Sequence, residues 1–202
     1  MNTFLALGDS YSIGEGVAPG ERWPVRLAAR LREEGVDIGE PRIVAKTGWT
    51  TDELSAAMDA ETFAPPYALV TLLIGVNNQY RGRDVDEYRA QFRDLLQRAI
   101  DLGGANPAHV IVVSIPDWGV TPFAAREGRD AAGVAREIDA FNAVACAASA
   151  HARAHWVDVT SISRAIGSRD ELVVDALHPS GAQYARWVET ILPVARVILG
   201  AD

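Results

Sequence analysis

The chain has 202 residues, of which 49% are hydrophobic and 23% charged, a length and mixture that suit one globular domain with a substantial core. The formal net charge of −8 at pH 7 argues against nucleic acid or an anionic membrane surface as a partner. The single cysteine, Cys146, excludes an internal disulfide, and no run of about 18 apolar residues predicts a membrane span.

The first predicted element is an apolar strand over residues 3–8. Met1 leads directly into this strand, without the basic region and long apolar core of a signal peptide. We therefore expect a cytoplasmic protein whose residues 1–202 form a single domain. A leader that had been removed would leave no trace in the sequence.

Gly8 ends this strand and delivers Asp9 and Ser10 onto a tight turn, which is where an exposed nucleophile belongs. A serine hydroxyl is a weak nucleophile and needs a base to take its proton. Either residue could instead be the ordinary N-cap of the helix that follows. Because Ser12 occupies the fifth position, the segment is not the Gly-x-Ser-x-Gly elbow of another large hydrolase class.

The next predicted elements are a helix at 22–34, a strand at 41–46 and a helix at 52–60. Gly48 lies between the last two. Its missing side chain would let the backbone N–H approach a ligand, although an ordinary turn glycine is the alternative. The neighbouring Trp49 could contact an acyl or sugar group, or simply pack in the core or at its rim.

A buried strand at 67–74 runs into a glycine and then Asn77, whose side-chain amide can donate to an oxygen that becomes negative. The alternative is a polar turn residue that satisfies local backbone groups. Tyr80 could contact substrate or pack at the rim. Arg81 and Arg83 could meet an acidic substrate group, but we interpret them as solvated loop residues and place them outside the site.

A helix at 84–102 and a strand at 108–115 follow. The segment 116–129 has no clear period and contains two prolines and two glycines. Within it, Trp118 and Phe123 could line a substrate wall, or could equally be the loop's own packing.

The last predicted elements are a helix at 131–152, a strand at 154–159 and a helix at 180–199. Asp175 and His178 lie just before the final helix. If they belong to a loop, the carboxylate can fold back and accept from one ring nitrogen, while the other ring nitrogen faces the proposed nucleophile.

The alternation of strands and helices predicts an α/β fold, a three-layer α/β/α sandwich with a flavodoxin-like, doubly wound, parallel five-stranded sheet. In such folds, ligands bind at the carboxyl ends of the strands. Ser10, Gly48 and Asn77 all follow predicted strands at that edge. The topology therefore brings these three residues together.

Other chemistries are disfavoured by the motifs. The glycine spacing completes neither a dinucleotide fingerprint nor a phosphate-binding loop. His109, His151 and His155 have no cysteine or acidic partner at metal-ligand spacing. We expect no cofactor and no metal.

Taken together, four segments resemble the sequence blocks of the SGNH or GDSL hydrolases, a family of esterases and lipases. The first block is matched by residues 8–10, the glycine block by Gly48, the Gly-x-Asn-Asp block by residues 75–78 and the Asp-x-x-His block by residues 175–178. All four occur in order and span most of the chain. The departure is Asn78, where the family pattern usually has aspartate.

By this resemblance, Ser10 is the nucleophile and the first oxyanion donor, through its backbone N–H. Gly48 is the second donor through its backbone N–H, and Asn77 is the third through its side chain. His178 acts as general base and then as general acid, and Asp175 orients it.

The resemblance implies a serine hydrolase that cleaves carboxylic esters with a short- to medium-chain acyl group, including carbohydrate deacetylase and thioesterase activities within the range. The expected partner is a small-molecule ester. The alternative is a non-catalytic ligand-binding module on the same fold.

Overall fold

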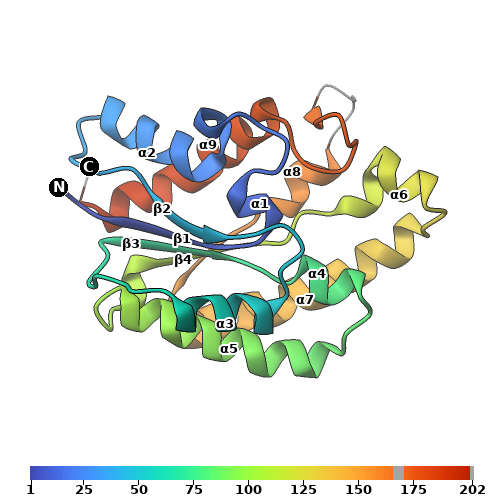
Figure 1. The fold of residues 1–202 in the computed structure, drawn as a ribbon, viewed down its shortest axis with the longest axis horizontal. Helices are drawn as coiled ribbons and strands as arrows, with labels where there is room; N and C mark the ends of the chain where they lie inside the picture. Colours follow the sequence, from blue (N-terminus) through green and yellow to red (C-terminus); the bar gives the residue numbers. More distant parts are fainter. Residues whose placement is uncertain (166–170, 201–202) are drawn as a thin grey trace.

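The computed structural model describes residues 1–165 and 171–200. Its centre is a parallel sheet with the strand order β2-β1-β3-β4-β5 (Figure 1). Each strand lies inside its predicted range, so the predicted strands and the flavodoxin-like order are confirmed. The strands are β1 (Phe4–Gly8), β2 (Arg42–Ala45), β3 (Leu69–Leu73), β4 (Val110–Val113) and β5 (His155–Val157).

Long helices cover both faces of this sheet. The helices α2 and α9 pack together on one face, and α3, α5 and α7 lie on the other (Figure 1). The sequence predicted all of them to within one residue at each end, which confirms the three-layer sandwich. The bounds are α2 (Trp23–Glu33), α3 (Thr51–Ala60), α5 (Val85–Leu102), α7 (Ala131–Ala152) and α9 (Gly181–Ile198).

Several short helices were not predicted from the sequence. Most are single turns, which are too short for a hydrophobic period to develop. The short α-helices are α1 (Ser10–Ile13), α4 (Val76–Tyr80), α6 (Pro122–Arg126) and α8 (Thr160–Arg164), and the 3₁₀ helices are η1 (Pro19–Glu21), η2 (Pro107–His109) and η3 (Trp118–Val120).

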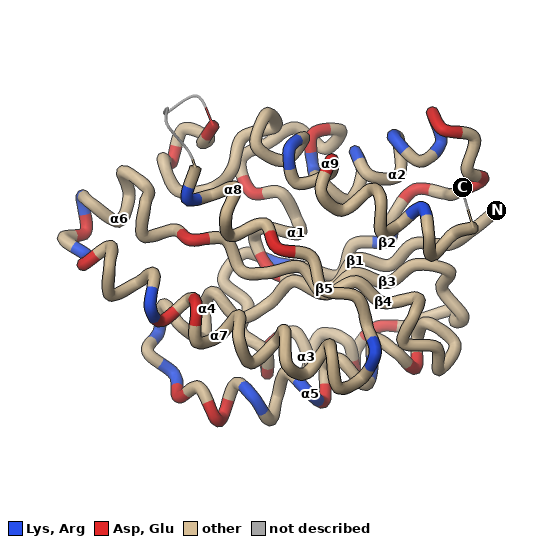
Figure 2. Tube along the Cα trace, turned by 180° about the vertical axis from the view of Figure 1, so that it is seen from behind, with Lys and Arg blue, Asp and Glu red and all other residues tan. Residues whose placement is uncertain are grey.

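The core lies between the sheet and its two helix layers. Strands β1 and β3 are buried along their whole length. From the helices, Tyr184 and Trp187 of α9 and Tyr88 and Phe92 of α5 are almost completely buried against the sheet or their neighbours. Charged residues of both signs are interspersed along the helices and loops and are almost absent from the strands (Figure 2).

The register aligns the carboxyl ends of the three strands at the centre of the site. Gly8 at the end of β1 pairs with Ala45 of β2 on one side and with Leu73 of β3 on the other. The loops that follow these strands therefore leave the sheet at one edge and at the same height, toward α1, α4 and α6 (Figure 1).

In the part of the chain that the structure describes, no helix combines the length and the apolar character needed to cross a membrane. The cytoplasmic location expected from the sequence stays a prediction.

Candidate active site

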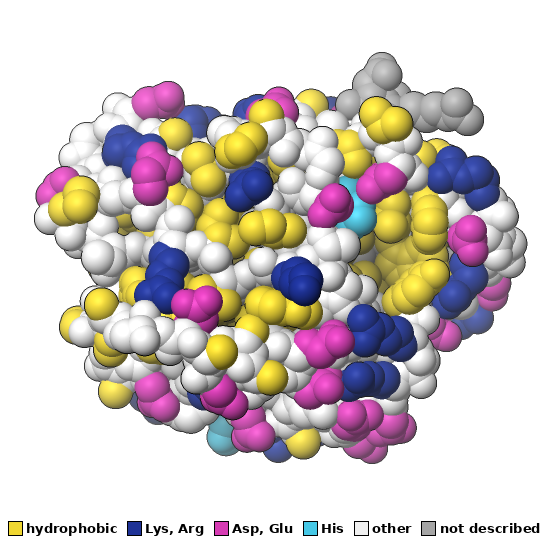
Figure 3. Space-filling model, in the orientation of Figure 1, with side chains coloured by type: hydrophobic (Ala, Val, Ile, Leu, Met, Phe, Trp, Pro, Cys, Tyr) yellow, Lys and Arg dark blue, Asp and Glu magenta, His cyan; other side chains and the backbone are white. Residues whose placement is uncertain are grey.

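A cavity of about 220 Å³ opens at the carboxyl edge of the sheet. Figure 3 shows a hollow on this side of the molecule that is walled by hydrophobic side chains and has a histidine on its border. Four residues singled out in the sequence, Ser10, Gly48, Asn77 and His178, line the cavity together. The remaining lining residues are Tyr11, Thr47, Val76, Tyr80, Trp118, Phe123 and Leu177.

Ser10 is the first residue of α1, directly after the turn that leaves β1. Asp9, rather than Ser10, is the N-cap, because its Oδ1 accepts the backbone N–H of Tyr11 at 3.0 Å. The turn is tight enough to require glycine at position 8, since a Cβ there would lie 2.5 Å from the carbonyl oxygen of Leu73. Ser10 is consequently held close to the sheet, with only 5% of its surface exposed.

The cap residue itself is unusual. Asp9 is fully buried, and its second carboxylate oxygen, Oδ2, accepts no hydrogen bond from the described residues. Burial raises the pKa of Asp9 to about 7, against the smaller opposing effect of the backbone hydrogen bond from Tyr11. A carboxyl group whose pKa is raised to about 7 therefore lies beside Ser10 in the chain.

Asp175 and His178 belong to an irregular loop that precedes α9. Asp175 folds back on the loop, so that its Oδ1 accepts the backbone N–H of His178 at 2.9 Å and its Oδ2 lies 2.6 Å from the Nδ1 atom of the same histidine. Partial burial alone would raise the pKa of Asp175, but the hydrogen bonds from the His178 ring and from backbone N–H groups outweigh it and hold the pKa below its ordinary value.

This contact determines which ring nitrogen of His178 is free. An ionised carboxylate only accepts hydrogen bonds, so the Nδ1 atom must carry the proton. The Nε2 atom of the neutral ring then has its lone pair available as a base. The ring is 5.6 Å from that of Tyr11, measured between centroids, and His178 is 8% exposed.

Gly48 lies in the turn after β2 and has a φ of 89°, a left-handed conformation that favours glycine. Its carbonyl accepts a hydrogen bond of 2.6 Å from Arg81. Among the described residues, no acceptor is bonded to the backbone N–H of Gly48 or to that of Ser10. Both backbone donors at the cavity are therefore without a hydrogen-bond partner among the described residues.

Arg81 is exposed and does not line the cavity, as expected from the sequence, but it contacts the turn that carries Gly48. Its second partner is Glu53, at 3.3 Å, so that Arg81 joins the turn after β2 to α4 and α3. The sequence carries no signal for this role, because the contact depends on a distance between segments that only the fold brings together.

Asn77 is the second residue of α4, whose N-cap, Gly75, lies two residues after the end of β3. The Nδ2 group of Asn77 carries two hydrogens. It donates one of them to the carbonyl of Trp49 at 2.9 Å, and the second is not used in this hydrogen bond. Gly75 has a φ of 129°, and a Cβ there would lie 2.6 Å from the Tyr88 ring. The close approach of α5 thus explains the glycine before Asn77.

The apolar wall of the cavity is aromatic. The ring of Trp118 packs edge-on against Tyr80 at 5.3 Å and against Phe123 at 6.3 Å, measured between centroids. The side chains of Trp118 and Phe123 therefore pack with one another and also line the cavity, so the structure is compatible with both interpretations of the 116–129 segment. Trp49 does not line the cavity; it packs partly buried against the core.

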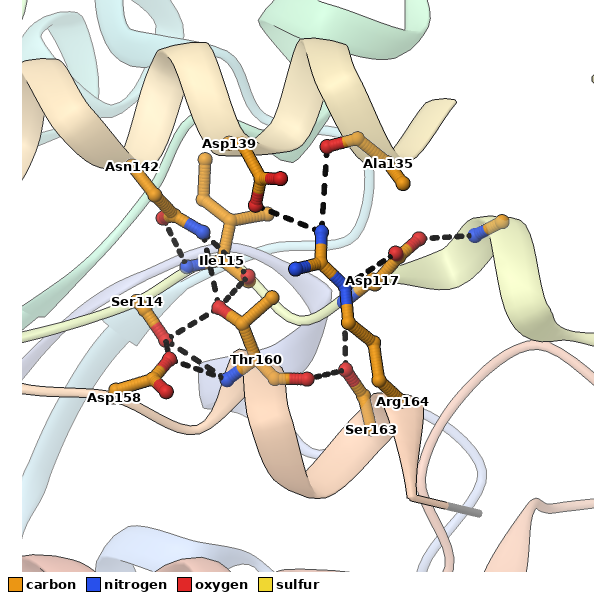
Figure 4. Close-up of polar contacts among 11 residues, drawn as sticks. Ser114, Ile115, Asp117, Ala135, Asp139, Asn142, Asp158, Thr160, Ser163 and Arg164 are labelled. Atoms are coloured by element: carbon orange, nitrogen blue, oxygen red, sulfur yellow. Dashed lines mark hydrogen bonds and ion pairs between the residues drawn. The ribbon is translucent and has the colours of Figure 1, made fainter. Parts of the chain in front are cut away.

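A network of polar side chains holds Asp117, the residue that precedes Trp118 of the aromatic wall. Asp117, which is 1% exposed, accepts from Arg164 at 2.8 Å and from the backbone N–H of Gly119 at 2.8 Å (Figure 4). Its own backbone N–H donates to Ser163. Arg164 also reaches Asp139 on α7, so α7 and α8 both hold the residue that precedes Trp118 (Figure 4).

In the described ranges 1–165 and 171–200, no three histidine, cysteine or acidic side chains gather closely enough to hold a metal ion. Sequence reasoning did not name Tyr11, Thr47, Val76 or Leu177 as lining residues. Each of them could have been found from its place in the sequence, because each is adjacent to a residue that the motifs had singled out.

Comparisons with known proteins agree on one family. Residues 6–186 match the model of the GDSL-like Lipase/Acylhydrolase family. The chain is 26% identical over 202 residues to the esterase TesA of Pseudomonas aeruginosa, an alignment that covers 98% of this chain and 89% of the relative.

Solved structures share the fold. A crystal structure of TesA superposes with a TM-score of 0.72 at 23% identity, covering 98% of this chain and 99% of that one. The psychrotrophic esterase EstA from Pseudoalteromonas sp., in a structure inhibited by monoethylphosphonate, gives 0.72 at 19% identity over 99% and 100% of the two chains. An acetyl xylan esterase from Geobacillus stearothermophilus gives 0.70 at 20% identity over 96% and 94%.

Proposed function

Because the chain belongs to the GDSL-like lipase/acylhydrolase family and is a carboxylic ester hydrolase, we propose that Ser10, His178 and Asp175 form its catalytic triad. The observation that carries the proposal is the cavity, which Ser10 and His178 line together, while Asp175 contacts the Nδ1 atom of the His178 ring. We also propose that residues 1–202 form one domain of this family.

In the proposed reaction, the Nε2 atom of His178 takes the proton of the Ser10 hydroxyl as the serine oxygen attacks the ester carbonyl carbon. The carbonyl double bond opens and its electron pair moves onto oxygen. The protonated His178 then gives its proton to the alcohol oxygen as the ester C–O bond breaks. Water, activated by the same histidine, releases the acyl group from Ser10.

Negative charge on the former carbonyl oxygen needs donors that are already in place. We assign this role to the backbone N–H groups of Ser10 and Gly48 and to the side-chain amide of Asn77. Two observations support the assignment. All three residues line one cavity, and the two backbone N–H groups make no hydrogen bond to the described residues.

The substrate class we propose is an ester with a short or medium acyl chain. The cavity is small, and Trp118, Phe123 and Tyr80 give it an apolar wall on which an acyl chain can lie. One of the solved neighbours is an acetyl xylan esterase, which fits the short end of this range, and a thioester would meet the same groups.

The test is covalent labelling with a fluorophosphonate, followed by intact-mass measurement. We expect one adduct on the wild type and none on Ser10→Ala, because only an activated serine attacks the phosphorus atom. Ser161→Ala is the matched control, since Ser161 is an exposed serine on α8 outside the cavity, and it should be labelled like the wild type.

A parallel panel of p-nitrophenyl esters from acetate to palmitate measures the acyl range. We expect kcat/KM to be highest for the short and medium chains and to fall toward palmitate. An adduct on Ser10→Ala, or full esterase activity in that variant, would contradict the triad. Highest activity on palmitate would contradict the proposed substrate class alone.

A further inference from the structure

Asn78, the residue that departs from the family pattern, is completely buried on α4 beside Asn77. Its side-chain amide pairs with Thr51, the first residue of α3. The backbone N–H of Thr51 donates to the Oδ1 atom of Asn78 at 3.1 Å, and the Nδ2 atom of Asn78 donates to the Thr51 hydroxyl oxygen at 2.7 Å. The two residues are thus joined by two hydrogen bonds across the gap between α4 and α3.

The hydroxyl of Thr51 continues the chain of hydrogen bonds onto α5. It donates to the Oε1 atom of Gln91, whose Nε2 atom donates in turn to Glu87 at 3.0 Å. The directions follow from groups that have a single role. The carboxylate of Glu87 only accepts, so Gln91 must turn its NH₂ group toward it, and a backbone N–H only donates, so Asn78 must turn its oxygen toward Thr51.

We call this chain of hydrogen bonds, from Asn78 through Thr51 to Gln91, the relay. The directions of its hydrogen bonds require an amide at position 78. A hydroxyl carries one hydrogen, and that of Thr51 is committed to Gln91. The group that faces the Thr51 oxygen from α4 must therefore be a donor. An ionised aspartate there would leave Thr51 with two acceptors to satisfy and one hydrogen to give, at a site where neither Thr51 nor residue 78 is exposed to water.

The relay lies behind the residues that we assign to the oxyanion hole. Asn77 precedes Asn78 on α4, and its amide reaches the carbonyl of Trp49, two residues before Thr51. Gly48, on the same turn, is bonded to Arg81 at the end of α4. A shift of α4 relative to the start of α3 would therefore separate the side-chain donor from the backbone donor.

We propose that Asn78 is a positioning residue that holds the Asn77 and Gly48 donors in register through an amide-specific relay with Thr51 and Gln91. In this chain the aspartate of the family pattern would impair turnover unless Gln91 also changed. The inference rests on the proposed function, because it concerns the residues assigned there to the oxyanion.

The experiment compares Asn78→Asp, Gln91→Leu and the double variant from about pH 6 to about pH 9 and reads kcat at the alkaline end, because burial raises the pKa of a carboxyl at position 78 and a protonated carboxyl could donate like the amide. Asn78→Asp should lower kcat about tenfold with a smaller change in KM, since the donors act on the transition state. Gln91→Leu should lower kcat only about twofold. The double variant should recover to within about threefold of the wild type, because the Thr51 hydroxyl is then free to donate to the carboxylate introduced at position 78.

Gln97→Leu is the matched control. Gln97 lies on the same helix, is exposed, and donates only to Asp101 at 2.9 Å. It should leave the wild-type kcat unchanged and should not rescue Asn78→Asp. If Gln97→Leu and Gln91→Leu act alike, or if Asn78→Asp turns over like the wild type, the inference is wrong.

Fluorophosphonate titration gives kcat per active serine and thermal unfolding gives stability for every variant. If Asn78→Asp lowers stability while kcat per labelled serine stays unchanged, its role is structural only and the inference is overturned. If Asn78→Asp does not fold, Thr51→Val and Thr51→Ser replace it, with a loss of kcat expected for valine and most of it retained for serine. Failure of the wild type to label would instead refute the proposed function.

Discussion

Asp9 shows how one buried group can set a pH dependence of stability. In the unfolded chain this carboxyl ionises with an ordinary pKa of 3.8, whereas in the folded protein burial raises the pKa to about 7. Between these two values the unfolded chain releases the proton and the folded chain keeps it. The free energy of unfolding therefore falls as the pH rises from about 4 to about 7, and no further loss from this group follows above that range.

Asp9→Asn should remove this dependence, because an amide does not ionise. Its oxygen can still accept the backbone N–H of Tyr11 and cap α1. Between about pH 4 and pH 7, the unfolding free energy of the wild type should therefore fall relative to that of the variant. Urea unfolding at about pH 5 and about pH 8 measures it, and parallel pH profiles for the two proteins would refute the prediction.

Asn77 is the proposed oxyanion donor that a substitution can remove. Asn77→Ala should lower kcat by a factor of about 100 to 1,000 with a smaller effect on KM, because the donor acts on charge that develops in the transition state. Steady-state kinetics on p-nitrophenyl acetate, corrected for the fraction of folded protein, checks this. A rise in KM at unchanged kcat would show that the amide only binds the ground-state ester.

At this scale, the sequence identified the residues that carry recognisable side-chain chemistry after a strand. Ser10 and Asn77 belong to that class, and both line the cavity. It could not identify Arg81, whose contact with Gly48 spans 33 positions in the chain. Nor could it explain Asn78, because the reason that we propose for an amide there depends on which of Thr51 and Gln91 donates each hydrogen bond.

At the scale of elements, α6 supports the loop that carries Asp175. The backbone N–H of Phe123 donates to the carbonyl of Ala176 at 3.1 Å, and Arg126 donates to the carbonyl of Asp175 at 3.0 Å. Among the hydrogen bonds of the described residues, these two join the tip of the loop to another segment. Since Phe123 also lines the cavity, α6 links the acyl wall to the proposed acid–base pair.

Arg126→Ala should therefore lower kcat about threefold with KM almost unchanged, a modest effect because Arg126 is exposed and one of the two hydrogen bonds remains. Arg126→Lys should restore part of it. The control is Arg136→Ala, which removes an exposed arginine of α7 whose partner is Asp130 at 3.7 Å. Equal kcat values for the two alanine variants would show that α6 does not support the loop.

The long helices were predictable and the short ones were not, for one reason. A helix such as α5 repeats its apolar face over several turns, so the 3.6-residue period is visible in the sequence. Helices α1, α4 and α6 have four or five residues each and depend on their N-terminal positions after a strand or a capped turn. These are the elements that carry Ser10, Asn77 and Phe123, so the least predictable elements build the site.

At the scale of the whole molecule, the pair between Asp117 and Arg164 ties the loop after β4 to α8, and Arg164 extends the tie to α7 (Figure 4). Arg164→Ala would leave the buried carboxylate of Asp117 without its cation. We expect the unfolding free energy to fall by about 1 to 3 kcal/mol, measured by urea unfolding at neutral pH.

The comparison variant is Arg89→Ala, which breaks an exposed pair with Asp86 on α5 at 3.2 Å. Such surface pairs contribute about 0 to 1 kcal/mol. A loss for Arg164→Ala no larger than the loss for Arg89→Ala would mean that solvent replaces the buried contact, and that the wall segment is held by its other hydrogen bonds.

The architecture was predictable because several independent patterns agreed. Apolar runs alternated with amphipathic ones, and the polar motifs fell at strand ends, which is where a parallel sheet gathers its ligands. The strand order is less accessible to such reasoning. That β1 lies between β2 and β3 decides that Ser10 lies between the Gly48 turn and α4.

The large separation of the proposed site residues along the chain has a consequence for protein synthesis. The proposed nucleophile, Ser10, is synthesised long before the loop that carries its proposed base, His178. Until that loop has emerged and docked beside α1, the serine has no imidazole to take its proton. If the proposed triad is correct, a nascent chain that ends before this loop should not hydrolyse esters, and the appearance of esterase activity in a translation reaction would report the completion of the fold.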